Sequence, residues 1–571
     1  MNTPNNSSAA LATLCERYWD FICFEQPLSA ILAGRSTVDD LLFRDSLKDQ
    51  ERRVASAKAF RVELEKISFE SLQSQDRITH RLLDHDLKIM IQAHDAKDHL
   101  RPMLYPLGPE SMLNYWADSS SFTCVDDAEA YIRKLRSIPE SLAGIKECLA
   151  AGQQQGIHYP QVVIERATAT LRGLLARPLD QSSLIQPFLK SSLQSDEFQT
   201  HKRTAETVLA EIVIPAISAY ADFIEKQLGA TARASIACTD APLGQELYQF
   251  QIERYTTERD SAEEIHAFGL SEVARISDEM QQIATAEGFP GNLAGYQASL
   301  PSKTGQISPN AEALRERIEI LSKRIDARIP EFFGRLPRMT YGIRSIPESI
   351  SAHMPPAYAQ PNPANGTTAG VHWITSLPER CPTYMHVPLA MHEAWPGHLM
   401  HLALMQEMEL PEFRRHDAAR YSSLVEGWAL YCEWLGNEFG FYDTPDKHYG
   451  RLEMQIWRAC RLVVDTGIHA KNWSRDQAIE FMRSHMSMPL ITITAEVDRY
   501  IGMPGQALAY QIGYRCFRNL RIEAEQQLGS SFRIRDFHDA LMATGAVTLP
   551  VLREFMQDWI QSRMALTSKA A

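Results

Sequence analysis

The sequence predicts a mainly α-helical protein with a small β-sheet near a candidate metal site. Apolar residues recur every three or four positions through most of the 571 residues, which is the pattern of amphipathic helices. Only Met339 to Arg344 and Gly370 to Thr375 have the composition of strands. Both stretches fall within residues 328–384, where prolines are frequent. Two readings of them stay open: a small sheet whose edge adds an extended substrate, or a pair of surface hairpin strands.

Helices are expected to fill most of the chain before residue 330. The first is predicted to end near Pro27 and a later one to kink at Pro215, because proline lacks a backbone N–H. The expected helices cover residues 11–26, 54–67, 78–89, 128–151, 160–176 and 195–228.

Two local signals add detail to this part of the chain. Residues 106–123 are rich in Ser, Gly and Pro and are predicted to form a loop. Ser261 and Glu264 form a capping box, which predicts a helix running past Met280. We divide the chain into an N-terminal helical lobe, residues 9–329, and a metal-binding lobe, residues 330–565, which together form one domain.

Composition restricts the class of protein. A hydrophobic content of 44% with 23% charged residues is typical of a soluble globular protein, and the net charge of −13 argues against nucleic acid or an anionic membrane as partner. The nine cysteines are scattered, without a C-x-x-C pair, as in reduced cytoplasmic proteins. No signal peptide and no uncharged apolar run of about 18 residues is found, so we expect a cytoplasmic protein without a membrane span. The oligomeric state is not set by the sequence.

The stretch from His392 to His398 contains the residues of a metal site. Two imidazoles and the carboxylate of Glu393 can hold a zinc ion and supply a general base. The two histidines are six positions apart, so a regular helix would point them about 120° apart, compared with about 40° for a spacing of four. Pro396 cannot donate a backbone hydrogen bond and Gly397 adopts unusual dihedrals, so we predict a helical bulge that turns His398 towards His392.

The alternative is a helix break between two ordinary histidines. Glu393 follows an apolar run, residues 387–391, in which an unpaired carboxylate would be costly. This position favours a metal site.

A third zinc ligand is expected from a following helix. Glu426 lies 28 residues beyond His398, and a glutamate there would complete a two-histidine, one-glutamate set with an open position for water. Glu433, almost two turns further along the same helix, is the fallback. Both could also be ordinary carboxylates outside the ligand set.

Further candidates lie near the C-terminus. Arg461, Asp465 and His469 form one helical stripe, in which Asp465 could orient His469 as an oxyanion donor, although an ordinary ion pair at this spacing is the alternative. Tyr510 is a second candidate oxyanion donor on a face that it shares with Tyr514, which we assign to substrate binding, although aromatic stripes are more often part of a core. A further candidate, Arg499, could bind a substrate carboxylate.

The chain resembles the bacterial family known as domain of unknown function 885, which is similar to helical zinc metallopeptidases of the glutamate-ligand type. The resemblance implies a helical, cleft-shaped protein, zinc held by His392, His398 and Glu426, and Glu393 as base. The residues that carry it are 392–398, Glu426-Gly427-Trp428-Ala429-Leu430-Tyr431, 465–469, Arg499-Tyr500, Pro504-Gly505-Gln506, Tyr510 and 537–539, with weaker similarity at 16–19 and 269–276.

The chain departs from the family pattern at three places. Members usually have another histidine directly after His398 and glutamine in place of His401. In the upstream strand they have an aromatic pair where this chain has His372 and Trp373, and Trp373 is accordingly a candidate for substrate binding. Many members look like exported lipoproteins, whereas this chain does not.

These residues favour a zinc-dependent hydrolase of amide bonds, most simply a peptidase acting on short peptides or acylated amino acids. Two alternatives stay open. A helical binding protein would keep the metal for structure alone and would need a fourth protein ligand. A non-haem iron or di-iron oxygenase would use a repeated E-x-x-H motif, and the pair Glu263 and His266 has no convincing second copy.

Overall fold

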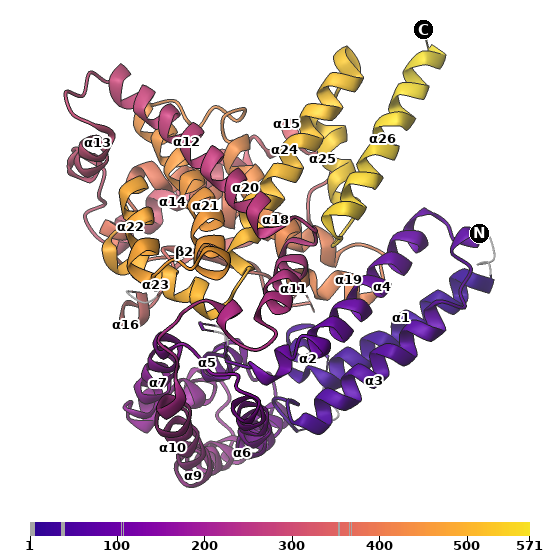
Figure 1. Ribbon diagram of the computed structural model, residues 1–571, viewed down its shortest axis with the longest axis vertical. Helices are drawn as coiled ribbons and strands as arrows, with labels where there is room; N and C mark the ends of the chain where they lie inside the picture. Colours follow the sequence, from indigo (N-terminus) through magenta and orange to yellow (C-terminus); the bar gives the residue numbers. More distant parts are fainter. Residues whose placement is uncertain are drawn as a thin grey trace. The chain divides into compact units, whose positions relative to one another are not determined.

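Helices dominate the structure, with one small mixed sheet, as the sequence predicts (Figure 1). The computed structural model describes residues 6–35, 40–103, 105–106, 108–351, 354–364, 366 and 368–570. The chain forms two compact units, one of Met1–Phe250 with Ala495–Pro504 and one of Gln251–Thr494 with Gly505–Ala571. The division into lobes at residue 330 stays a prediction.

In its described residues, the first unit consists of helices joined by turns and connecting segments, with one isolated β-bridge between Pro160 and Arg233. Two helices, α11 and α23, contribute residues to both units. The helices are α1 (Asn6–Glu25), α2 (Pro27–Leu32), α3 (Leu47–Leu64), α4 (Ser74–Asp95), α5 (Pro109–Ser119), α6 (Val125–Gln154), α7 (Gln161–Leu175), α8 (Gln186–Lys190), α9 (Asp196–Val208), α10 (Ile214–Asp222), α11 (Gly244–Thr256) and α23 (Leu490–Gly502).

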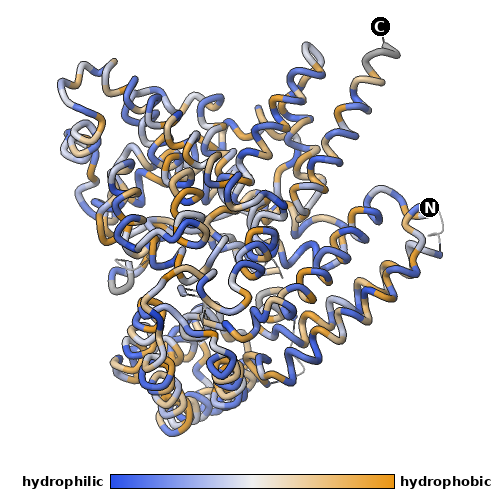
Figure 2. Tube along the Cα trace, in the orientation of Figure 1, coloured by the Kyte–Doolittle hydropathy of each residue, from blue (hydrophilic) through white to orange (hydrophobic). Residues whose placement is uncertain are grey.

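The expected helical periodicity is visible in α3. Its buried residues are Val54, Ala57, Phe60 and Leu64, which recur at spacings of three and four. Figure 2 shows the same recurrence of hydrophobic and hydrophilic positions along the helices.

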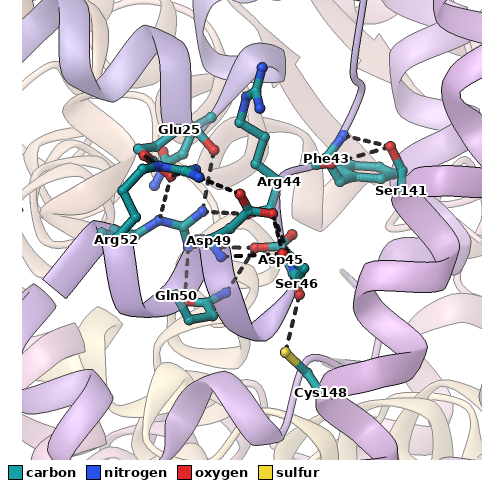
Figure 3. Close-up of polar contacts among 12 residues, drawn as sticks. Glu25, Phe43, Arg44, Asp45, Ser46, Asp49, Gln50, Arg52, Ser141 and Cys148 are labelled. Carbon is teal, nitrogen blue, oxygen red and sulfur yellow. Dashed lines mark hydrogen bonds and ion pairs between the residues drawn. The ribbon is translucent and has the colours of Figure 1, made fainter.

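A network of polar contacts fixes the start of α3 (Figure 3). Ser46 and Asp49 form a capping box there, and Arg52 donates from Nε to the buried carboxylate of Glu25 in α1 at 2.8 Å. The thiol of Cys148 in α6 donates to the backbone oxygen of Asp45 at 3.1 Å, and burial raises the pKa of this thiol to about 12. The network therefore joins three helices that are distant in sequence.

The prediction of a loop over residues 106–123 is wrong, because α5 occupies most of it. Pro109 stands in the first turn, where its missing N–H costs nothing. Leu113, Trp116 and Ala117 are almost completely buried at helical spacing. Apolar periodicity outweighs the turn-forming composition here.

The helical stretch Asp196–Thr231 is long and apolar enough, by length and composition, to cross a membrane. In this unit its apolar residues, among them Phe198, Leu209, Ile217 and Ile224, pack in one core with α6 and α7. The irregularity expected at Pro215 is present as a π-helical turn, Leu209–Val213, directly before α10.

The second unit contains the sheet and the remaining helices. Its strands are β1 (Tyr341–Ser345), β2 (Ala357–Gln360) and β3 (Gly370–Ile374). Its helices are α12 (Ala262–Ala286), α13 (Leu293–Ser299), α14 (Ala311–Asp326), α15 (Ile329–Phe332), α16 (Glu348–Ser351), α17 (His386–Glu393), α18 (His398–Gln406), α19 (Glu412–His416), α20 (Ser422–Leu435), α21 (Pro445–Lys471), α22 (Arg475–His485), α24 (Ala509–Leu528), α25 (Ile534–Met542) and α26 (Leu549–Ala570). The helix predicted from the capping box at Ser261 is α12, and both reciprocal hydrogen bonds of the box are formed.

The sheet has the order β1-β3-β2. The two strands expected from the sequence, β1 and β3, pair in parallel, so they do not form a hairpin. A third strand, β2, pairs antiparallel with β3 and was not anticipated, because four residues are too few to show a pattern. Helices α17 and α18 contact this sheet, which places it beside the His392 to His398 stretch.

Two helix pairs form the framework around that stretch: α12 packs along α21, and α20 packs along α24. Gly427 of α20 faces Gly513 of α24 so closely that a Cβ atom on Gly427 would lie 2.5 Å from the Cα atom of Gly513. The close approach of α20 and α24 therefore depends on both glycines.

Candidate metal centre

His392 and His398 lie at the facing ends of two short helices. His392 is in the last turn of α17, and His398 is the first residue of α18. Their ring centroids are 4.7 Å apart and their planes are almost perpendicular. The expected approach of the two rings is thus present, but the predicted bulge within one helix is wrong, because the chain ends one helix and begins another.

The turn between the two helices explains how two histidines that are six positions apart can approach each other. A Cβ atom on Gly397 would lie 1.9 Å from the carbonyl oxygen of His392, so only glycine fits without a shift of the backbone. The indole N–H of Trp428, from α20, donates to the carbonyl oxygen of Pro396 at 2.9 Å. The turn is therefore held both by its own tight packing and by the neighbouring helix.

Glu426 of α20 lies close to both imidazoles. Its Oε2 lies 3.4 Å from Nε2 of His392 and 3.5 Å from Nε2 of His398. Zinc bonds of about 2.0 to 2.2 Å arranged as a tetrahedron place neighbouring ligand atoms about 3.3 to 3.5 Å apart. The same Oε2 is buried and has no hydrogen-bond partner of good geometry. These residues therefore fit a zinc ion.

Glu393 lies close to the same point. One ligand atom from each of His392, Glu393 and His398 is within 4.8 Å of the others, and all three residues are buried. The side chains of these residues and Glu426 are thus brought together by three helices, α17, α18 and α20.

Glu433 approaches His392 from the other side of the ring. Its Oε1 accepts a hydrogen bond from Nδ1 of His392 at 2.8 Å and lies 3.3 Å from a guanidinium nitrogen of Arg458. With Nδ1 as the donor, Nε2 keeps its lone pair for a metal. Glu433, the fallback ligand, is therefore placed to orient His392.

The carboxylates change the protonation of the metal-free group. Burial lowers the pKa of His392, but Glu426 and Glu433 outweigh burial and raise it to about 9. Burial also raises the pKa of Glu426, and its contacts with the two imidazoles more than reverse this, so that the pKa falls well below its usual range. A cationic species at this point is favoured, whether it is a proton or a metal ion.

Two further buried histidines, His372 and His401, lie near His392 and His398. His372, in β3, is fully buried with neither ring nitrogen hydrogen-bonded, and burial with the nearby His392 lowers its pKa to about 3. Burial, together with His398, also lowers the pKa of His401 to about 3. Both rings are neutral and add no charge to the site. A buried position for His372 could have been suspected from its place in an apolar strand.

The predicted oxyanion donors belong to α21 and α24. Asp465 is buried and accepts the backbone N–H of Gly505 through both carboxylate oxygens, each at 3.1 Å. His469 is fully buried one turn further along α21. The guanidinium of Arg461 lies over the ring of Tyr510, 4.2 Å from its centroid. The catalytic roles of Asp465, His469 and Tyr510 stay predictions.

The three predicted substrate-binding residues lie in different surroundings. Arg499, in the first unit, forms an ion pair with Glu496 at 2.9 Å. Trp373 of β3 donates its indole N–H to Gln360 of β2 at 2.8 Å. Tyr514 of α24 lines a cavity whose walls include none of the four residues grouped at the candidate metal centre.

Comparison with known proteins supports the family resemblance. The sequence profile of the family described as "Bacterial protein of unknown function (DUF885)" matches residues 27–556. No curated protein matches the sequence.

Two solved structures are similar along nearly their whole length. The first is a putative lipoprotein from Colwellia psychrerythraea, with a TM-score of 0.91, 26% identity, and coverage of 97% of this chain and 99% of the other. The second is a putative lipoprotein of unknown function from Shewanella oneidensis, with a TM-score of 0.75, 18% identity, and coverage of 96% and 99%, which shows a shared fold.

Proposed function

The chain belongs to the DUF885 family of bacterial proteins of unknown function, and we propose that it is a zinc-dependent hydrolase of amide bonds. The observation that carries the proposal is the position of the Glu426 Oε2 atom, 3.4 and 3.5 Å from the two imidazole Nε2 atoms and without a hydrogen-bond partner of good geometry. Two histidines and one glutamate are a ligand set of catalytic zinc sites, which keep one position open.

Zinc held by this set would polarise a substrate carbonyl and make a water molecule more acidic. Glu393, beside the ligand atoms, would accept a proton from the attacking water while the hydroxyl group bonds to the carbonyl carbon. Glu393 would then pass that proton to the leaving nitrogen as the C–N bond breaks.

Other residues are assigned supporting roles in this proposal. His469 and Tyr510 would donate to the oxyanion, with Asp465 orienting His469. Trp373, in the strand β3 that contacts α18, would contact the rest of the substrate, whereas Tyr514 lines a separate cavity and is given no role in this reaction. We propose short peptides or acylated amino acids as substrates, since each combines an amide bond with a free carboxylate.

Turnover of a mixed peptide library by the wild-type protein and by Glu393→Gln tests the mechanism. The variant is expected to keep its metal and to lose activity by about 10²- to 10⁴-fold. Equal activity of the two proteins would remove Glu393 as the base.

An iron(II) enzyme is the second candidate, because two histidines and one carboxylate also form the facial triad of non-haem iron oxygenases. Elemental analysis of protein purified without added metal, together with its optical absorption, distinguishes the two metals. A structural metal is less favoured, because Glu433, a candidate fourth ligand, is already engaged by Nδ1 of His392 and by Arg458.

A further inference from the structure

A polar cavity of about 420 Å³ lies within the second unit. Its lining residues belong to α12, α20, α21 and α24, the helices labelled in Figure 1. Its lining includes none of His392, Glu393, His398 or Glu426. Its charged lining residues are Glu272, Arg275, Glu279, Arg451, Arg515 and Arg518.

The cavity is rich in cations although the protein carries a net charge of −13. Four arginines and two glutamates give its lining a charge of +2, and Asp260, which pairs with Arg515 from outside the lining, reduces this to +1. Arg275 is neutralised by Glu272, with two hydrogen bonds of 2.9 Å. Arg451 lies 3.6 Å from a carboxylate oxygen of Glu279, so the excess positive charge is carried by Arg518.

Arg518 is the least neutralised of these cations. Its guanidinium stacks on the indole ring of Trp434, 3.4 Å from the centroid. Within the described part of the chain it forms no ion pair in direct contact, and its charge interaction is with Glu438, a carboxylate outside the cavity lining that also pairs with Arg521. Stacking fixes the plane of the guanidinium and leaves its edge available to an anion.

Two buried polar atoms of the cavity-lining residues, Nε of Arg451 and Oε1 of Gln511, have no hydrogen-bond partner. The side chain of Arg451 is 8% exposed, and its Nε–H has no hydrogen bond, while its terminal nitrogens contact Gln455, His448 and, at 3.6 Å, the carboxylate of Glu279. Gln511 is fully buried, and its amide nitrogen donates to Glu272 at 3.0 Å, but its Oε1 accepts no hydrogen bond. Buried polar groups are normally satisfied, so an unused donor and an unused acceptor in one cavity indicate a ligand that supplies both partners.

We propose that this cavity binds a small organic carboxylate that also carries an N–H or O–H donor, such as an amino acid. The carboxylate would bind between Arg451 and Arg518, since guanidinium groups match its two oxygens. The donor of the same ligand would bind to Oε1 of Gln511. Because no residue of the metal group takes part, the site is independent of the proposed hydrolase activity.

Calorimetric titration of the full-length, metal-loaded protein tests the proposal, with L-glutamate, glutarate and inorganic phosphate as probes. L-Glutamate is expected to bind more tightly than glutarate, which has no ammonium group, and more tightly than phosphate. Arg518→Gln should weaken L-glutamate binding by at least about tenfold, and Gln511→Leu should remove the preference for L-glutamate over glutarate. Arg324→Gln, which changes an exposed arginine on α14, should bind like the wild type.

The possible outcomes distinguish binding in this cavity from binding elsewhere in the protein. Binding of L-glutamate that is unchanged by Arg518→Gln would place the ligand elsewhere, for example at the metal, and would overturn the proposal. Binding of phosphate alone, or of no probe, would also overturn it. Because Arg518 is partly exposed, Arg518→Gln should keep the melting temperature of the wild type. An unchanged melting temperature shows that the loss of binding is not caused by unfolding.

Discussion

Nδ1 of His392 lies 2.8 Å from Oε1 of Glu433, while Nε2 of the same ring lies 3.4 Å from Oε2 of Glu426. One ring is thus held between two carboxylates of a single helix, α20, that are seven residues apart, or about two turns. Glu433 accepts from Nδ1 of the ring, and Glu426 approaches its Nε2 together with Nε2 of His398. Their different roles lead to different expectations for mutation.

Replacing Glu426 with glutamine should abolish tight metal binding. The amide keeps the shape of the side chain but removes the negative charge that zinc requires of this ligand. Metal content measured by mass spectrometry should fall from one equivalent to well below it. Glu316→Gln, on the exposed face of α14, is the matched control and should keep its metal. Full occupancy in Glu426→Gln would exclude this glutamate from the ligand set.

Replacing Glu433 with glutamine should weaken metal binding without abolishing it. The amide can still accept from Nδ1 of His392, but it no longer strengthens the imidazole as a ligand, and it leaves Arg458 without its carboxylate. Loss of such an outer partner typically costs about 10- to 100-fold in metal affinity. Competition with a chromophoric chelator measures this change. A complete loss of metal, equal to that of Glu426→Gln, would mean that Glu433 is itself a ligand.

Gly397→Ala should disrupt the metal centre through the backbone. The new Cβ atom would lie 1.9 Å from the carbonyl oxygen of His392 and 2.4 Å from that of Met391, so the turn must open and His398 must move. We expect loss of metal and a decrease of more than about 1 kcal/mol in the free energy of unfolding. Gly173→Ala in α7, where a Cβ atom meets nothing within 4 Å, controls for the change of residue type. Normal metal binding by Gly397→Ala would contradict the tight-turn explanation.

Acid should destabilise the protein through His538. Its ring lies 2.9 Å from both the hydroxyl of Tyr431 and the carbonyl oxygen of Phe332, a pattern that satisfies the neutral imidazole. Burial, with a smaller contribution from Arg521, lowers the pKa of His538 to about 3, whereas the unfolded chain titrates near 6.5. Between these values the unfolded state binds a proton that the folded state does not, so stability should fall as pH falls from about 6.5 to 3.

His538→Gln should reduce this slope. Thermal unfolding of the variant and the wild type, compared at pH 7 and at intervals down to pH 4, separates the lost hydrogen bonds from the lost titration. His201→Gln, on α9, is the control and should keep the wild-type slope. Parallel curves for His538→Gln and the wild type would show that His538 does not cause the acid sensitivity.

Local sequence patterns determined the helical class and the residues of the candidate site. The periodicity of α3, the capping box at Ser261 and the composition of β1 and β3 were sufficient to predict those elements, because each depends on neighbours in the chain. The sequence also identified His392, Glu393 and His398 as candidate site residues, because they are neighbours in the chain.

Only the tertiary structure decided how these residues meet. The break after Glu393, the hydrogen bond from Trp428 to the turn and the approach of Glu426 to both imidazoles depend on α20, which lies some 30 residues further along the chain. The same holds for β2 and for the arginine-lined cavity, whose walls come from four separate helices. The spacing of residues along the chain indicates which side chains lie on the same face of a helix or strand. The distance between two helices is set by the packing of their side chains, as where Gly427 of α20 meets Gly513 of α24. The sequence alone therefore named the candidate metal-binding residues, and the packing of α17, α18 and α20 brings Glu426 to the Nε2 atoms of both histidines and Glu433 to Nδ1 of His392.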